Sequence, residues 1–220
     1  IYIFDGCFTF ENGLCLTFKT YISTFFFCFF TWLITLLIGF CVAYFLAFYV
    51  NSLPLQITLF LICTIPFWTS NVIRMVSWIP LLGRNGLVND TLITLGLIQE
   101  PIEWLLYSSF SVILALVHLY TLFMIVPIFN SMLRIDKEVI EAAYDSGANQ
   151  FQIIKNVIIP LCKPGIIIGS IFVITVVMGD FLTIGIMGGQ QLASIGKIIN
   201  TEMNYLQLPG AAANSVILLF

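Results

Sequence analysis

Long apolar stretches without charge dominate the chain. Residues 20–73 contain no Asp, Glu, Lys or Arg. A single helix over that stretch would be about 80 Å long at ~1.5 Å per residue, whereas the hydrocarbon core of a bilayer is about 30 Å thick. The cluster Asn51-Ser52-Leu53-Pro54 combines polar and helix-breaking residues, which indicates a turn. The pattern therefore predicts two membrane-spanning helices, over residues 21–50 and 55–78.

The rest of the chain alternates in the same way. Further apolar stretches predict spans over 109–133 and 164–186, and part of a span over 210–220. A polar break at 79–107, a charged segment at 134–163 and a Gly-rich polar loop at 187–209 separate them. Because the chain opens on Ile1 rather than Met and stops inside an apolar run, we expect a fragment truncated at both ends.

Composition agrees with a protein whose solvent is lipid. The chain is 60% hydrophobic and 9% charged, with a mean hydropathy of +1.06, whereas an ordinary globular domain carries about 25% charged residues. The apolar runs are too long for the alternating strands of an outer-membrane barrel. The predicted fold is therefore an all-α transmembrane, polytopic helical bundle. We find no basic run typical of nucleic-acid binding, no Cys/His spacing typical of a metal site and no catalytic cluster, so we expect no cofactor.

The distribution of basic residues predicts the orientation of the chain. Four of the eight lysines and arginines, Arg134, Lys137, Lys155 and Lys163, lie in the segment 134–163. The positive-inside rule therefore places this segment in the cytoplasm. Alternation of the spans then places 1–19, 79–107 and 187–209 outside.

The sequence of the cytoplasmic segment predicts two short helices joined at a glycine. Asp136 is a candidate N-cap for a helix over 137–146, and Gly147 lies where a left-handed residue would end it. Asn149 can cap a second helix that Pro160 is expected to end. The apolar face of that second helix is expected to hold Phe151, Ile154, Val157 and Ile158.

The motif in this segment resembles the EAA loop of binding-protein-dependent ABC importer permeases. Glu141-Ala142-Ala143, three residues, Gly147, nine residues and Val157-x-Ile159-Pro160 keep the spacing of that loop, with Val157 and Ile159 replacing Ile and Leu. Most of the chain is also similar to polyamine (spermidine/putrescine) permeases of the first subunit type. That similarity includes Ile65-Pro66-Phe67-Trp68-Thr69-Ser70 with Ile73-Arg74, Phe123-Met124-Ile125-Val126-Pro127-Ile128 and Pro164-Gly165-Ile166-Ile167-Ile168-Gly169-Ser170.

The resemblance implies a function and a set of partners. Residues 1–220 would form one type I importer transmembrane domain in the bacterial inner membrane, lacking the first of six spans and most of the sixth. It implies a second permease subunit, an extracytoplasmic substrate-binding protein and a separate cytoplasmic ATPase dimer, so the chain itself would not be an enzyme. The ATPase-coupling residues that it implies are Glu141, Ala142, Ala143, Gly147 and Pro160.

Three residues are candidates for a translocation path. Asp180 lies in a predicted span, where an ionisable group is a functional candidate by default, and its carboxylate would suit a cationic polyamine. Its alternatives are a carboxylate at a helix end or a partner for Arg74. Trp68 can contact a cation through its ring, or can belong to the aromatic belt of the membrane interface.

Two other classes of membrane protein and other substrates stay open at this point. An ABC permease for ferric iron, thiamine or sulfate would carry the same coupling loop. An ion-coupled secondary transporter would need paired intramembrane charges and related halves, which we do not find. A membrane-embedded enzyme would need a cluster such as HExxH, which the sequence lacks.

Overall fold

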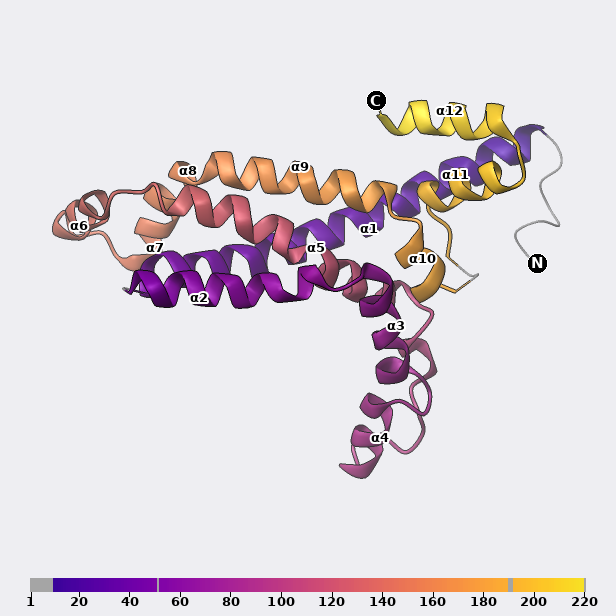
Figure 1. Ribbon diagram of the computed structural model, residues 1–220, viewed down its shortest axis with the longest axis horizontal. Helices are drawn as coiled ribbons and strands as arrows, with labels where there is room; N and C mark the ends of the chain where they lie inside the picture. The colour runs from indigo at the N-terminus through magenta and orange to yellow at the C-terminus, as the bar shows by residue number, and fades with distance from the viewer. Residues whose placement is uncertain (1–9, 51, 190–191, 220) are drawn as a thin grey trace. The chain divides into compact units, whose positions relative to one another are not determined.

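The regular structure of the chain is helical. The computed structural model describes residues 10–50, 52–189 and 192–219, and among these it contains helices and loops but no strand. This confirms the predicted all-α class. The chain divides into two compact units. The long helices α1, α5 and α9, labelled in Figure 1, each contribute one part to each unit.

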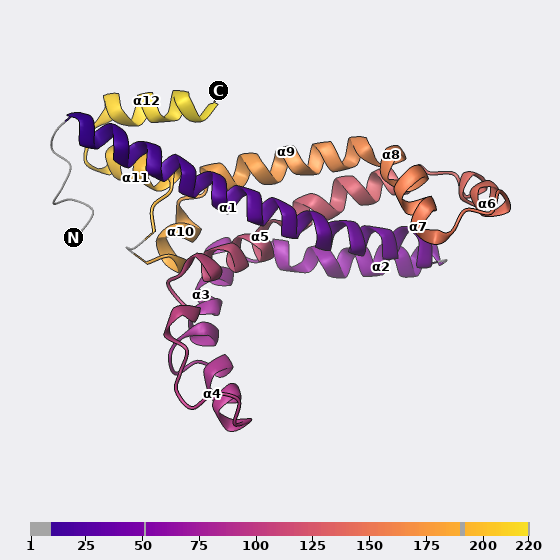
Figure 2. The same cartoon turned by 180° about the vertical axis from the view of Figure 1, so that it is seen from behind.

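The second unit comprises Trp32–Thr69 and Val117–Ile174. Its elements are parts of α1 (Phe10–Tyr44), α5 (Ser109–Met132) and α9 (Lys163–Gly179), with the complete helices α2 (Leu53–Thr64), α6 (Lys137–Asp145), α7 (Gln150–Ile153) and α8 (Ile159–Leu161). It also contains two π-helical turns, η1 (Phe45–Tyr49) and η4 (Ile154–Ile158), and the 3-10 turn η2 (Ile65–Trp68). The short helices α6 and α7 lie at the end of this unit where α5 ends (Figures 1 and 2).

Glycines let the long helices of the second unit approach closely around Met124, which is fully buried. A Cβ built on Gly165 would lie 2.4 Å from the Pro127 carbonyl oxygen and 2.6 Å from Ser131 Oγ. Cβ atoms on Gly39 and Gly169 would lie 2.9 Å and 2.8 Å from the Met124 side chain. Small residues are the usual means of close helix packing in membranes, because lipid supplies no hydrophobic force between helices.

The first unit comprises the described parts of Ile1–Thr31, Ser70–Leu116 and Thr175–Phe220. Besides its parts of α1, α5 and α9 it contains α3 (Asn71–Leu82), α4 (Leu87–Thr94), η3 (Glu103–Leu105), α10 (Leu182–Met187), α11 (Ile195–Asn204) and α12 (Leu208–Leu219). Buried polar contacts hold it together. The Ile195 amide donates to Thr24 Oγ1 at 3.1 Å, and Ser111 Oγ donates to the Met187 carbonyl oxygen at 3.1 Å.

Lys197 has a structural role in the segment that the sequence places outside. Its ammonium donates to the Gly189 and Leu192 carbonyl oxygens at 2.9 and 3.1 Å. Burial lowers the pKa of this group below its ordinary value. The two bonds tie the start of α11 to the loop that precedes it.

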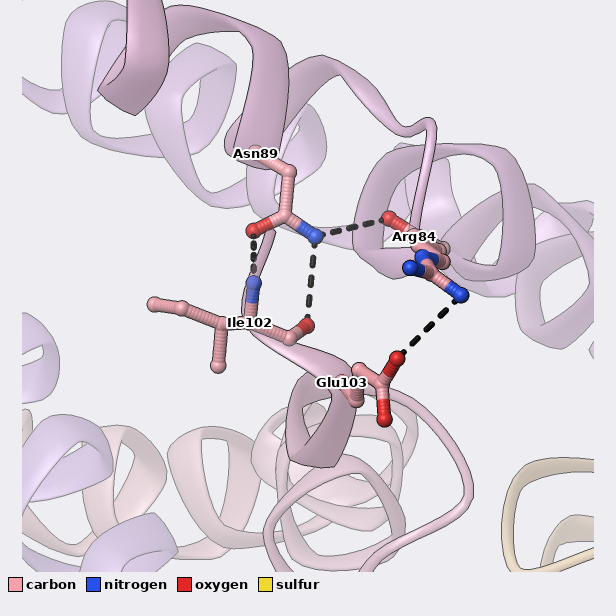
Figure 3. A network of polar contacts seen from close by, with 5 residues as sticks. Arg84, Asn89, Ile102 and Glu103 are labelled. Atoms are coloured by element: carbon pink, nitrogen blue, oxygen red, sulfur yellow. Dashed lines mark hydrogen bonds and ion pairs between the residues drawn. The ribbon is translucent and has the colours of Figure 1, made fainter. Parts of the chain in front are cut away.

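The polar segment that follows α3 is a structured hairpin. Asn89 is fully buried, and its side chain bonds three backbone groups (Figure 3). Nδ2 donates to the carbonyl oxygens of Gly83 and Ile102 at 3.0 and 3.2 Å, and Oδ1 accepts from the Ile102 amide at 2.9 Å. Arg84 and Glu103 add an ion pair at 3.2 Å whose side chains are mostly exposed. Asn89 therefore holds the two ends of the hairpin together.

We expect Asn89→Ala to open this hairpin. The change leaves three half-buried backbone groups without this partner, at a cost of about 1–3 kcal/mol. Limited proteolysis and hydrogen exchange of residues 83–105 should both become faster. The matched control is Asn85→Ala, because Asn85 is exposed. Equal exchange rates in the two variants would show that Asn89 does not hold the hairpin.

Two helices in the described part of the chain are long and apolar enough to span a membrane, and two further candidates are broken pairs of helices. Lys19–Tyr49, with 31 residues, and Ser109–Met132, with 24, are each long and apolar enough to cross a bilayer. Leu53–Trp68 with Asn71–Thr94, and Gln150–Leu161 with Lys163–Gly179, satisfy the same test only as broken pairs. The apolar helix α12 is shorter. Asn51 and Phe220, at the edges of predicted elements, lie outside the described residues.

Two predicted spans are interrupted. The stretch 55–78 breaks at Thr69–Ser70, where both residues have extended ψ angles of 152° and 135°. Pro66 in the preceding 3-10 turn lacks an amide hydrogen, which weakens the helix at this point. The stretch 164–186 breaks at Asp180, between α9 and α10. Both breaks fall at polar residues, Thr69-Ser70 and Asp180, that lie inside otherwise apolar stretches.

Candidate functional site

The turn between α6 and α7 has the geometry expected from the sequence. Gly147 has φ +82°, the left-handed conformation that favours glycine. Its amide donates to the Tyr144 carbonyl oxygen at 2.9 Å, and the Ala148 amide donates to that of Ala143 at 3.1 Å. Together these bonds form a Schellman motif, which satisfies the last carbonyl groups of α6. The predicted glycine C-cap is confirmed.

The start of α7 is also confirmed. Asn149 Oδ1 accepts from the Gln152 amide at 2.9 Å, and Gln152 Oε1 accepts from the Asn149 amide at 2.9 Å. This reciprocal pair is a capping box. Asp136 has the extended backbone of an N-cap, but its carboxylate accepts no capping bond from the described backbone of α6. The two helices are therefore fixed mainly at the glycine turn between them.

The second helix of the segment differs from the prediction in two ways. Pro160 does not end it: the helical path continues through η4 and α8 to Leu161. The π turn shifts the bonding register, with the Ile159 amide donating to the Ile154 carbonyl oxygen, which accommodates a proline without an amide donor. The predicted apolar face is confirmed at Ile158, which is buried, and is wrong at Phe151, which is exposed, while Ile154 and Val157 are half-buried. Ile153 and Ile158 are buried, 2% and 1% exposed, whereas Phe151 is 72% exposed. The buried residues Ile153 and Ile158 are five positions apart, because the π turn between them has one residue more than a turn of α-helix.

The helix α6 presents its side chains to the surroundings. None of its residues is buried. Glu141 and Ala142 are exposed, and Ala143 is half-buried. A cavity of about 540 Å³ opens beside its start, lined by Arg134, Asp136 and Val139 together with residues of α5, α8 and α9. This helix can therefore be contacted closely by another protein, because two alanines place little bulk over its backbone.

Asp180 occupies the break between α9 and α10. It is half-buried. Its Oδ1 accepts from the Thr183 amide at 2.9 Å, and its Oδ2 accepts from the Thr183 hydroxyl. A carboxylate in this place acts as a cap for α10. The geometry supports the alternative in which Asp180 belongs to a helix end rather than to the middle of a continuous helix.

The other two path candidates have contrasting surroundings. Arg74 in α3 is 8% exposed, and its guanidinium donates to Asn71 Oδ1. It belongs to the first unit, like Asp180. Trp68, at the end of η2 in the second unit, is 85% exposed. Exposure of a whole indole suits either a membrane interface or a partner.

The structure also shows polar residues that the sequence reasoning missed. Gln56 is 7% exposed and bonds the backbone of η1, and Gln150 at the start of α7 bonds two tyrosines of α1 and η1. A signal for Gln56 exists in the sequence, since it is a rare amide in the uncharged stretch 20–73. The partners of both residues depend on tertiary contacts.

Comparison with known proteins gives one family for nearly the whole chain. Residues 14–220 match the family described as "Binding-protein-dependent transport system inner membrane component". The match includes every residue of α6 and α7 and each of the candidate path residues.

The chain aligns with part of the length of each individual relative. The chain is 35% identical over 175 residues to the spermidine/putrescine transport system permease protein PotB of Escherichia coli (strain K12), which covers 78% of this chain and 63% of that protein. It is 39% identical over 144 residues to the PotB protein of Haemophilus influenzae, covering 66% of this chain and 50% of the relative. It is 28% identical over 166 residues to the inner membrane ABC transporter permease protein YdcU of E. coli K12, covering 70% and 52%. The aligned regions thus span about half to two thirds of these relatives.

Proposed function

This chain belongs to the family of binding-protein-dependent transport system inner membrane components, and we propose that it is a permease subunit of an ATP-driven importer for polyamines. It is a multi-pass protein of the bacterial inner membrane. In this proposal it forms the translocation path with a second permease subunit and receives its substrate from an extracytoplasmic binding protein. A separate cytoplasmic ATPase dimer supplies the energy.

The observation that carries the proposal is the exposed helix α6 ending in the Gly147 turn. The sequence Glu141-Ala142-Ala143 lies on a helix without a buried residue. Such a helix satisfies two requirements of a coupling element: another protein can reach it, and a defined turn fixes it to the next helix. The proposed position of 134–163 in the cytoplasm makes it accessible to an ATPase.

The mechanism proposed for this segment is mechanical. ATP binding closes the ATPase dimer, and α6, seated in a cleft of the ATPase, moves with it. When α6 moves, α7 moves with it, because the hydrogen bonds of the Schellman turn and the capping box fix the angle between the two helices. From α7 the helical path through Pro160 reaches Leu161, and after a bend of 68° at Cys162 the chain continues in α9. The spans then alternate between inward and outward openings.

Polyamines are the proposed substrate class. The two PotB relatives are named as spermidine/putrescine permeases. Asp180 would attract an ammonium group at the break between α9 and α10, and Trp68 would contact a cation through its ring face. Arg74, buried in α3, completes the set of proposed path residues.

Reconstitution of the full-length protein tests this function. Proteoliposomes would contain the permease pair and the ATPase, with the binding protein and radiolabelled spermidine or putrescine outside. We expect uptake to require ATP and to be inhibited by excess unlabelled polyamine but not by ferric iron, thiamine or sulfate. Uptake that follows an ion gradient in the absence of ATP would contradict the proposal. Inhibition by one of the other solutes alone would contradict the polyamine assignment.

Asp180→Asn is expected to reduce polyamine uptake about tenfold. The amide retains an oxygen that can accept from the Thr183 amide, so the cap of α10 should persist, while the negative charge that favours an ammonium group is lost. A charge-assisted hydrogen bond is worth about 1–2 kcal/mol more than a neutral one, and ~1.4 kcal/mol is a factor of ten. The measurement is the rate of uptake against substrate concentration. Asp90→Asn is the control, because Asp90 is exposed; equal uptake by both variants would remove Asp180 from the path.

A further inference from the structure

The π-helical turn η1 is fixed to α2 by a buried side chain. Gln56 Nε2 donates to the Leu46 carbonyl oxygen at 2.8 Å, and the Gln56 side chain is almost fully buried. Leu46 itself is 2% exposed. A buried amide in an apolar setting has few alternatives to this bond, so a displacement of η1 displaces α2 as well.

The same turn is bonded to the cytoplasmic segment by exposed side chains. Gln150 Nε2 donates to the Tyr49 hydroxyl at 3.0 Å and to the Tyr44 hydroxyl at 3.4 Å. Both views show α7 beside the ends of α1 and α2 (Figures 1 and 2). Gln150 is the first residue of α7 and lies between the two residues of the capping box, Asn149 and Gln152, so its backbone is held in place.

The two hydroxyls are presented by a group of aromatic rings. The rings of Tyr44 and Tyr49 meet edge to face with centroids 5.9 Å apart. Tyr44 also stacks on Phe40 at 6.3 Å, and Tyr49 stacks on Phe45 at 6.0 Å. These contacts limit the rotation of both phenols, because the Tyr44 ring packs on three others, Phe48 included, and the Tyr49 ring packs on two.

The contact of Gln150 with Tyr44 and Tyr49 joins α7 to helices that the backbone does not connect to it closely. The chain joins α6 and α7 to α5 and α9 directly, so the backbone carries motion to those helices. Tyr49 precedes Gln150 by 101 residues. The movement of α7 therefore reaches α1 and α2 through side chains. The contact joins the π turn η1 to α7, which the π turn η4 follows, and π turns in α-helices are frequent at functional sites.

We propose that Gln150 and the hydroxyls of Tyr44 and Tyr49 form a coupling latch, through which displacement of α6 and α7 moves the end of α1 and, through Gln56, α2. The latch rests on the proposed function, since it is the docked ATPase that displaces α6. Its members are positioning residues: they touch neither nucleotide nor substrate. An exposed hydrogen bond adds little to stability, so its loss should uncouple the transporter without unfolding it.

Substitution of Gln150 separates the latch from a merely structural role. Gln150→Met keeps the length of the side chain and removes the donor. Gln150→Glu retains the contact, because a tyrosine hydroxyl can donate to the carboxylate. The readouts are polyamine taken up, ATP hydrolysed, ATPase association and apparent melting temperature, all in the reconstituted complex. The control is Tyr205→Phe, because Tyr205 is 72% exposed in the first unit.

We expect Gln150→Met, and the double variant Tyr44→Phe with Tyr49→Phe, to lower the polyamine transported per ATP by about three- to tenfold. Gln150→Glu should restore most of that ratio, and ATPase association should not change. An unchanged ratio in Gln150→Met, or equal loss in Gln150→Glu and Gln150→Met, would overturn the latch. If the wild-type protein fails to bind the ATPase or imports without ATP, the proposed function fails as well, so the two failures are distinguishable.

Discussion

Gly147→Asp is expected to abolish polyamine uptake while the amount of protein in the membrane stays unchanged. Gly147 has φ +82°, and a Cβ built there meets no atom within 4 Å. The added side chain therefore causes no collision, and aspartate tolerates the left-handed conformation better than most residues, at a cost of about 1 kcal/mol. The fold should persist.

The loss arises at the surface that we propose for the ATPase. A new carboxylate next to α6 would be buried without a partner when the ATPase docks. Unpaired charge in an interface costs about 2–5 kcal/mol, which corresponds to a loss of about 30-fold to 1000-fold or more in association. Uptake and co-purification of the ATPase both measure this effect.

Gly96 offers a matched control for this substitution. It has φ +71° and open space around its Cβ, but it follows α4 in the first unit. Gly96→Asp thus has the same backbone cost and the same added charge, and it should retain ATPase association. Normal association and uptake by Gly147→Asp would refute the coupling role of this turn.

Gly165→Ala should have the largest effect on stability. Its Cβ would lie 2.4 Å from the Pro127 carbonyl oxygen, which is backbone and cannot move without shifting α5. Overpacking of this kind costs about 1–3 kcal/mol. At about 2–4 °C per kcal/mol for a chain of this size, we expect the apparent melting temperature in detergent to fall by roughly 2–12 °C.

Two neighbouring glycines supply comparisons. Gly179 lies in the same helix with open space around its Cβ, so Gly179→Ala should leave the melting temperature unchanged or slightly higher. Gly169→Ala should have an intermediate effect, since its closest neighbour is the flexible Met124 side chain. Equal melting temperatures for Gly165→Ala and Gly179→Ala would show that α5 and α9 separate at little cost.

Interactions between residues close in sequence could be predicted from the sequence. The left-handed turn at Gly147 and the capping box of Asn149 depend on residues at most five positions apart, and the structure confirms both. The all-α class also follows from the sequence, because long apolar runs in lipid must satisfy their own backbone hydrogen bonds. The membrane orientation stays a prediction from the distribution of Lys and Arg, and the roles of the coupling residues stay what the resemblance to the EAA loop implies.

Other features needed the tertiary structure. Which face of a helix is buried depends on the elements packed against it, so the helical spacing of α7 and η4 did not show that Phe151 is exposed and Ile153 buried. The helix α9 ends before Asp180, whose carboxylate accepts from the Thr183 amide, whereas the helical path that follows α7 continues through Pro160 after the π turn η4. Helical spacing in the sequence did not distinguish these two outcomes. The contact of Gln150 with Tyr49 joins residues 101 positions apart, and only the packing of α7 beside α1 brings them together. The sequence by itself thus determined the helical class, the glycine turn and the cap of α7, whereas the tertiary structure decided which helices lie beside that turn, because those contacts join residues far apart in the chain.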